Sequence, residues 1–360
     1  AGCNIFVGRN AGCKADTNVY RNMIMGECAG VCIGNDSGQN IFLGCGAGYC
    51  ACCCNTNNIM VGTEAGAMTG CGQESNIFIG ACAGCNVHAD NAIVIGASAS
   101  RGSSSSHTSI GRRTASNSIV IGRSAGSSAS LTSAIAIGCE TAQCAKFSLL
   151  RSVIIGDLAA NACCTANCFQ TSTSFKGCHV IIGYQAGCNI AGHGYSDVFI
   201  GMGAGNNNNG CRNIAIGEFA GAASGGSSGI HSGGQSNVHI GRAAGSGHTR
   251  GNFNITMGHY AGNDARFMDK NVFIGRYSGR RMGAEQHPDG CYSQHNTAVG
   301  NGALEGASIS NFRVLNIARY NVAIGAYAGR NVSQGCFNVY VGNSAGSGQS
   351  NGDGNVAIGR

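Results

Sequence analysis

Cysteines are the most numerous residues in this chain that can form disulfides or bind a metal. There are 22 of them among the 360 residues, and twelve precede residue 86. Cys50 with Cys53 and Cys82 with Cys85 each form a C-x-x-C pair, and residues 162–168 read ACCTANC. Thiolates bind zinc, but the two pairs are farther apart than the ~15–20 residues of a usual zinc ribbon, and neither cysteine-rich stretch (50–55 or 162–168) contains a histidine. We therefore expect disulfides, with metal binding as the alternative, and predict no metal or other cofactor.

The cysteine content also predicts a location. Thiols in the cytosol are kept reduced, whereas an oxidising environment makes them useful as cross-links. We predict an extracellular protein, or one on a virion or cell surface.

The other reactive residues do not indicate an enzyme. The ten histidines, among them His88, His193 and His287, share no position in the repeat described next and have no recurring carboxylate partner. We expect no catalytic and no cofactor-binding residues.

The cysteines and histidines stand in a chain built from many copies of one short sequence motif. The stretch NIFVGRNAG begins at Asn4 and has close copies beginning at Asn40, Asn76, Asn271 and Asn321. Each copy is aligned on its first glycine, called the anchor. The anchors are Gly8, Gly26, Gly44, Gly62, Gly80, Gly96, Gly122, Gly138, Gly156, Gly183, Gly201, Gly217, Gly241, Gly258, Gly275, Gly300, Gly325, Gly342 and Gly359, and a degenerate copy adds Gly111. The basal period of 16–18 residues, with insertions in some intervals, is typical of a solenoid with loops on one side.

Each copy predicts one short strand. The residues three and one before the anchor are aliphatic in nearly every copy, for example Ile5 and Val7, or Ile77 and Ile79. This alternation, rich in β-branched residues, indicates a strand with one buried face. Stacked coils place each strand ~4.8 Å from its copy, so the coils share one core. We predict an all-β fold, a single β-solenoid (β-helix or β-roll) of about 19–20 coils over residues 1–360, open at both ends.

Two further columns of the repeat carry predictions. The first motif residue is Asn in thirteen of the nineteen anchored copies, and we interpret these residues as a structural ladder of stacked amides. The residue two before the anchor is expected to point outward, between the two core positions. It is mostly apolar, so we predict a stripe that contacts another copy of the chain; cover by a second layer of the same chain is the alternative. The aromatic members of this self-association stripe are Phe6, Phe42, Phe78, Phe199, Phe273 and Tyr340.

Five cysteines are disulfide candidates, because neighbouring coils bring them nearly into register. Cys13 lies five residues after its anchor, Cys32 and Cys50 lie six after theirs, and Cys54 and Cys71 lie ten and nine after theirs. Such residues are ~5 Å apart at Cα, within the range that a disulfide requires. Buried free thiols are the alternative.

Three N-x-S/T sequons occur in the chain. Asn254 stands in the Asn column, so we expect it to be buried and unmodified. Asn35 and Asn331 lie between strands and are candidate glycosylation sites.

Composition excludes several classes of protein. The 61 glycines come without a three-residue period and with one proline, which excludes collagen, and the recurring Ile, Val and Phe with a net charge of +6 exclude disorder. No apolar run approaches the ~20 residues of a membrane helix, and the arginines are mostly scattered. We therefore predict neither a membrane span nor a nucleic-acid partner.

The forms NVFIG at Asn271 and HVIIGYQAG at His179 resemble the repeats of trimeric autotransporter adhesin heads, and still more the NTAIGYQAL-type arrays of phage and bacterial tail-fibre proteins. The resemblance covers the chain from Asn4 to Gly359 and implies a β-roll or β-helix stalk that is commonly trimeric and exposed to the outside.

The last residues of the sequence, joined to its first residues, read NVAIGR-AGC, which is one residue short of a complete copy. This predicts either head-to-tail stacking of subunits or a slice of a longer solenoid.

These observations predict a structural subunit of an extracellular or virion-surface fibre. We expect it to associate with itself, head to tail or laterally, to be reinforced by disulfides, and to bind a cell-surface or glycan receptor through its insertion loops where it is adhesive. Two alternatives stay open. One is an enzyme similar to the left-handed β-helix acyltransferases, whose coils also have 18 residues, and the other is a receptor-binding adhesin head.

Overall fold

The computed structural model describes residues 2–51, 53–102, 113–143, 148–161, 177–190, 196–208, 210–222, 234–247, 251–265, 267–282, 293–306, 318–332, 334–349 and 351–360. They fall into two compact units, Ala1–His179 and Val180–Arg360. The predicted single solenoid over residues 1–360 stays a prediction. Among the described residues there is no helix with the length and apolar character needed to cross a membrane.

Each unit is built on one parallel sheet in which every strand has three residues. The strands of the first unit are β1 (Ile5–Val7), β2 (Met23–Met25), β3 (Ile41–Leu43), β4 (Ile59–Val61), β5 (Ile77–Ile79), β7 (Ile93–Ile95), β9 (Ile119–Ile121), β11 (Ile135–Ile137) and β13 (Val153–Ile155). Those of the second are β14 (Val180–Ile182), β15 (Val198–Ile200), β16 (Ile214–Ile216), β17 (Val238–Ile240), β18 (Ile255–Met257), β20 (Val272–Ile274), β22 (Thr297–Val299), β23 (Val322–Ile324), β24 (Val339–Val341) and β25 (Val356–Ile358).

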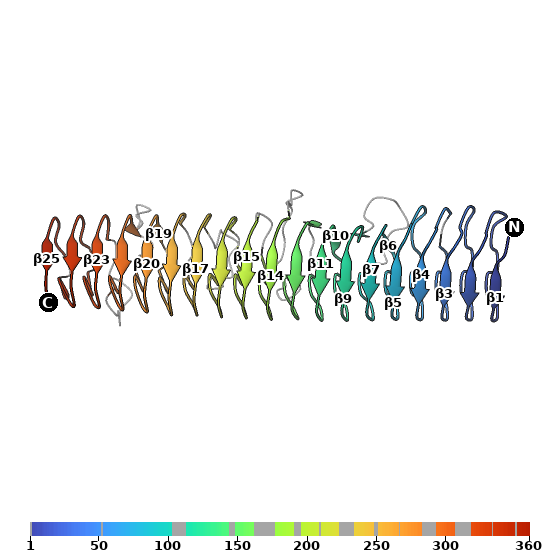
Figure 1. Cartoon of the computed structure of the whole chain (residues 1–360), viewed down its shortest axis with the longest axis horizontal. Coiled ribbons are helices and arrows are strands. Elements are labelled where there is room, and N and C mark those ends of the chain that lie inside the picture. Colours follow the sequence, from blue (N-terminus) through green and yellow to red (C-terminus); the bar gives the residue numbers. More distant parts are fainter. Residues whose placement is uncertain are drawn as a thin grey trace. The chain divides into compact units, whose positions relative to one another are not determined.

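The register of these sheets follows the repeat. Each strand pairs in parallel with the strand of the next copy, and equivalent motif residues face one another, as in β3 and β4, where Ile41 pairs with Ile59 and Phe42 with Met60. Figure 1 shows the strands of each unit as a row of parallel arrows, one to a coil. The predicted all-β solenoid is therefore confirmed. The longest predicted insertions contain residues 103–112, 162–176, 223–233, 283–292 and 307–317, and these, like Gly111, lie outside the described residues.

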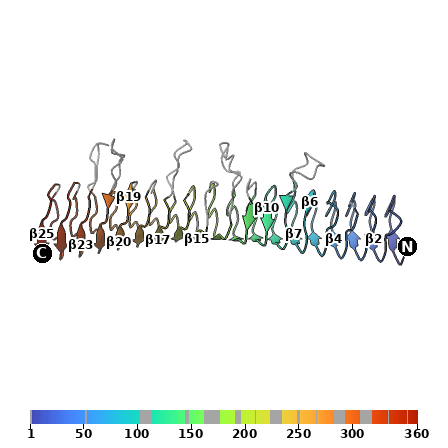
Figure 2. The same cartoon turned by 90° about the horizontal axis from the view of Figure 1, so that it is seen from above.

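Further parallel pairs, of two or three residues, form away from the main sheet. They join β6 (Val87–His88) to β8 (Arg113–Thr114), β10 (Ser130–Thr132) to β12 (Ser148–Leu150), and β19 (Met268–Asp269) to β21 (Ser293–Gln294). Figure 2 shows β6, β10 and β19 on the side of their coils opposite the main sheet. The coils that contain these pairs therefore have strands on two sides.

The core contradicts the predicted stripe. The middle residue of each motif strand points inward, and Phe42, Phe78, Phe199 and Phe273 are completely buried, with Tyr340 1% exposed. The ring of Phe6, which is 42% exposed in β1, also lies against the corner at Gly12 and not on the outer face. The outward assignment is therefore wrong for these six residues. Side chains alternate along a strand, so either the middle residue or both end residues point inward; here the middle residue does, on the same side as the buried Asn column two positions before it.

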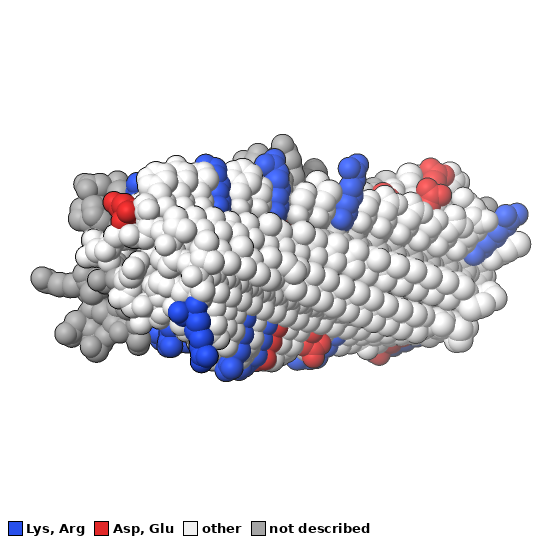
Figure 3. All heavy atoms as spheres, turned by 60° about the vertical axis from the view of Figure 1, so that its left-hand side comes forward, with Lys and Arg blue, Asp and Glu red and all other residues white. Residues whose placement is uncertain are grey.

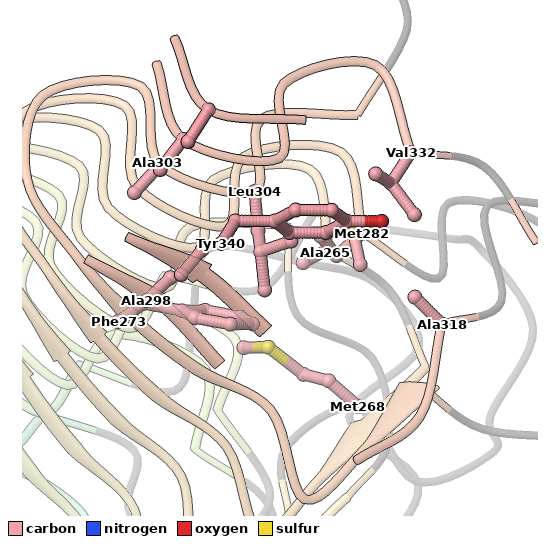
Figure 4. Packing of buried hydrophobic residues seen from close by; sticks show 13 residues of the cluster. Ala265, Met268, Phe273, Met282, Ala298, Ala303, Leu304, Ala318, Val332 and Tyr340 are labelled. Atoms are coloured by element: carbon pink, nitrogen blue, oxygen red, sulfur yellow. The ribbon is translucent and has the colours of Figure 1, made fainter. Parts of the chain in front are cut away.

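The inward column varies in size, and the other sides of the coils compensate. In the second unit the middle residues of β22 and β23 are Ala298 and Ala323, between the large Phe273 and Tyr340. One buried cluster contains these residues together with Leu304, Met268 and Met282, which come from corners and short strands. Figure 4 shows Leu304 and Met268 beside the two rings.

The predicted amide ladder is confirmed. The Oδ1 atom of Asn40 accepts hydrogen bonds from the backbone N and the Nδ2 of Asn58, and Asn58 accepts the same pair from Asn76, all at 3.0–3.1 Å. The Nδ2 atoms of the ladder residues before Asn355 also donate to a backbone carbonyl just ahead of the motif strand of the next coil, as Asn58 does to Gln73 at 3.0 Å. Asn254 belongs to the same kind of ladder in the second unit and is completely buried, as expected.

The anchor glycines allow the coils to approach closely. Gly44 has a φ of +136°, and a Cβ atom at this position would lie 2.6 Å from the carbonyl oxygen of Gly62 in the next coil. Only glycine fits both the conformation and the distance.

Candidate functional site

The main sheets present an exposed aliphatic face in each unit. This face consists of the first and third residues of every motif strand, which point away from the core. In the first unit all eighteen of these positions hold Ile, Val, Leu or Met, and in the second all twenty do except Thr297. None of them is buried, and Val7, Ile79 and Ile324 are 50%, 39% and 46% exposed.

Charged side chains stand beside this face and not on it. Figure 3 shows an uncharged strip with Lys, Arg, Asp and Glu gathered along its margins. One margin is the corner that follows the anchors, where ion pairs join neighbouring coils: Arg9 with Glu27, Arg123 with Glu140 at 3.1 Å, and Arg242 with Glu218 at 3.1 Å. These pairs are exposed, so they contribute little to stability, and their main effect is to border the apolar strip with charge.

The size of the face makes it significant. Nine strands at about 4.8 Å spacing, each with three residues of about 3.3 Å, cover roughly 400 Å² in the first unit alone. The face of this unit alone is as large as the largest apolar patch of a typical soluble monomer, which is about 300–600 Å² and is often functional. Sequence reasoning placed the exposed apolar face on the wrong residues, one position away from those that form it.

The cysteines approach one another in the first unit, though not in all the predicted pairs. No disulfide joins any two of the sixteen cysteines in the part of the chain that the structure describes. Cys32 and Cys50 stand in register, and burial together with the neighbouring Cys32 thiol raises the pKa of Cys50. Cys13 lies one position out of that column, although the backbone N of Cys32 donates to its carbonyl oxygen at 2.9 Å.

The partner expected for Cys71 is different. Cys53 and Cys71 both lie nine residues after their anchors, and a hydrogen bond between their side chains is the largest cause that raises the pKa of Cys53. Cys54, the predicted partner, lies one position further along and interacts with Cys53 instead, which raises the pKa of Cys54. The correction follows from the strict register of the coils, which separates side chains that differ by one residue.

A third group forms around the C-x-x-C pair of Cys82 and Cys85, whose carboxylate partner the sequence did not predict. Cys82 and Cys85, a C-x-x-C pair, meet Glu64 from the preceding coil, and the three ligand atoms lie within 4.8 Å of one another. Burial, followed by the neighbouring Cys82, raises the pKa of Cys85 to about 12. Among the described residues this is the one group of three such side chains with metal-ligand spacing.

The candidate glycosylation sites differ in accessibility. Asn35 is half-buried, and its Oδ1 accepts hydrogen bonds from Thr17 Oγ1 at 3.3 Å and from the backbone N of Asn18 at 3.1 Å. Asn331 is exposed. Of the histidines named above, His88 lies in β6, and His193 and His287 lie outside the described residues.

The fold and its surfaces define a parallel β-solenoid repeat protein. No protein-family model matches the chain, and no curated protein sequence matches it either.

Proposed function

We propose that this chain is a structural subunit that associates with copies of itself, through the aliphatic face, to build an extracellular or surface fibre. The observation that carries the proposal is the composition of that face. Eighteen outward positions in succession are aliphatic in the first unit, although the buried column beneath them accepts residues as different as Phe, Met and Ala. Water disfavours such a surface, whereas a second copy presents the same shape and the same apolar groups to it.

The flat geometry favours a second copy as the occupant. A parallel sheet normally has both faces covered, and here one face of each main sheet is not. Two such faces can pack at the spacing of about 10 Å that is usual for stacked sheets, with the charged margins left in water. The motif resemblance to adhesin heads and tail fibres fits an assembly of this kind. Catalysis has no part in this proposal.

The proposal also includes disulfides between neighbouring coils, which would reinforce the fibre. Equivalent positions of neighbouring coils are about 4.8 Å apart, which is within the Cα range of a disulfide. Cys32 with Cys50, and Cys53 with Cys71, are the in-register pairs that an oxidising environment would join. Peptide mapping of protein purified without reducing agent tests this, and free thiols at all four positions would remove disulfide reinforcement from the proposal.

Self-association is tested by placing charge on the face. The double variant Ile79→Lys/Ile324→Lys adds one lysine to the aliphatic face of each unit. The matched control, Ala81→Lys/Ala326→Lys, adds the same charges two residues further along, at the corner where Arg9 and Arg123 already stand in other coils. Light scattering and electron microscopy then measure the assembly.

We expect the wild-type chain to form assemblies and the control to form the same ones. The variant on the face should weaken association by more than about 100-fold, because an unpaired buried charge costs several kcal/mol. Wild-type particles of 36.3 kDa, the mass of one chain, would overturn the proposal, and so would equal assembly by the two double variants.

A further inference from the structure

Three ligand-bearing side chains converge at one corner of the first unit. Glu64 and Cys82 occupy the same position in neighbouring coils, two residues after the anchors Gly62 and Gly80. Cys85 follows Cys82 in the C-x-x-C turn. The Sγ atom of Cys82 lies 3.4 Å from Oε2 of Glu64, and the Sγ atom of Cys85 lies 2.6 Å from the backbone carbonyl oxygen of Glu64.

We propose that Cys82, Cys85 and Glu64 form a zinc site. Zinc takes thiolate sulfur at about 2.3 Å and carboxylate oxygen at about 2.0–2.2 Å, in tetrahedral geometry. Two sulfurs on such an ion are roughly 3.8 Å apart, and the three ligand atoms here all lie within 4.8 Å of one another. Three protein ligands leave the fourth position to water or to a group from outside the chain.

The backbone holds the ligands in place before any ion binds. The N–H of Glu64 donates to the Cys45 carbonyl at 2.8 Å, and the N–H of Cys82 donates to the Thr63 carbonyl at 2.9 Å. Both residues have left-handed φ angles, 55° and 54°, which the coil imposes on this column. The fixed backbone lowers the conformational entropy lost on binding, and the exposed side chain of Glu64 is what binding must still order.

Burial differs among the three ligands in a way that suits a cation site. Cys85 is 4% exposed, Cys82 is half-buried and Glu64 is exposed. An ion would therefore enter from the side of Glu64 and meet a buried thiolate at the inner end. With both thiols deprotonated the cluster carries three negative charges, and a divalent cation replaces the two released protons with equal charge.

The same two sulfurs could instead form a disulfide, so the experiment must separate the two outcomes. The full-length chain is reduced, freed of metal, and titrated with Co²⁺ without oxygen, because thiolate-bound cobalt absorbs in charge-transfer bands. The variants are Cys82→Ser, Cys85→Ser and Glu64→Gln. Cys28→Ser is the matched control, since Cys28 stands in the same column, two residues after Gly26, with a φ of 54°.

We expect the wild-type chain and the Cys28→Ser control to bind one more equivalent of Co²⁺ than either Cys82→Ser or Cys85→Ser, and Zn²⁺ to displace it. The side chain of Glu64 is exposed, so Glu64→Gln should leave the fold intact. This variant should weaken Co²⁺ binding by more than about tenfold. Zn²⁺ should also protect Cys82 and Cys85 from alkylation. Equal cobalt stoichiometry in all the chains would overturn the proposal. So would a Cys82–Cys85 disulfide in the purified chain together with no cobalt band once that disulfide has been reduced.

Discussion

Removing one amide from the Asn ladder provides a sharp test of how the coils are held together. Asn58→Ala leaves the backbone of β4 intact and removes a side chain that is completely buried. The Oδ1 atom of Asn58 accepts hydrogen bonds from the backbone N and the Nδ2 of Asn76, each at 3.0 Å. Its Nδ2 donates to Asn40 Oδ1 at 3.1 Å and to the Gln73 carbonyl at 3.0 Å.

The cost follows from which groups lose their partners. Nδ2 of Asn76 keeps its second acceptor, the Ala89 carbonyl, and Asn40 Oδ1 keeps the backbone N of residue 58. The backbone N–H of Asn76 loses its acceptor in a buried position, which costs about 1–3 kcal/mol, and the bond to the Gln73 carbonyl contributes about 1 kcal/mol more. We expect a loss of roughly 2–4 kcal/mol in the free energy of unfolding of the coils around β4 and β5.

Hydrogen exchange measured by mass spectrometry is the suitable assay, because solenoids open locally and a global midpoint would average over coils. A loss of about 3 kcal/mol accelerates exchange by more than about 100-fold in peptides that contain residue 76. Asn18→Ala is the matched control, since Asn18 is exposed and its Nδ2 bonds to Asp36 at the surface, at 3.3 Å. Equal exchange in the two variants would refute the view that the ladder stabilises the stack.

Three further predictions concern the anchors, the core and alkaline pH. Gly44→Ala should destabilise the first unit by more than about 2 kcal/mol in denaturant unfolding, from backbone strain and contact with the next coil, whereas Gly2→Ala, with open space around it, should be neutral within about 0.5 kcal/mol. Phe78→Ala should cost about 3–5 kcal/mol and Phe6→Ala, at a 42%-exposed position, clearly less; equal losses would contradict the complete burial of Phe78. Burial raises the pKa of Tyr340 above its ordinary 10.0, so above pH 10 the unfolded chain loses this proton before the folded chain does, and stability falls as pH rises. Tyr340→Phe should reduce that fall, as followed by unfolding at pH 9 to 11.

The position of the Asn column could have predicted which face of each strand points inward. Side chains alternate along a strand, so the residue four before the anchor and the residue two before it point to the same side. The Asn column stands at the first of these positions, and a ladder of bonded amides belongs inside. Asn76 and Phe78 therefore share the interior, and Ile77 and Ile79 face out. Apolar residues on both faces of the strand hid this relation, because hydrophobicity alone suits either orientation.

The sequence by itself determined the period, the parallel strands, the glycine corners and the amide ladder, because each is a local requirement written again in every copy. The tertiary structure decided which of two apolar faces is buried, since that depends on what the rest of each coil supplies to the core, as Leu304 does beside Ala298 and Ala323. It also decided which cysteines meet. Cys71 lies beside Cys53 and not Cys54, and Glu64 reaches Cys82 from 18 residues away, because stacking turns equal positions in successive coils into neighbours.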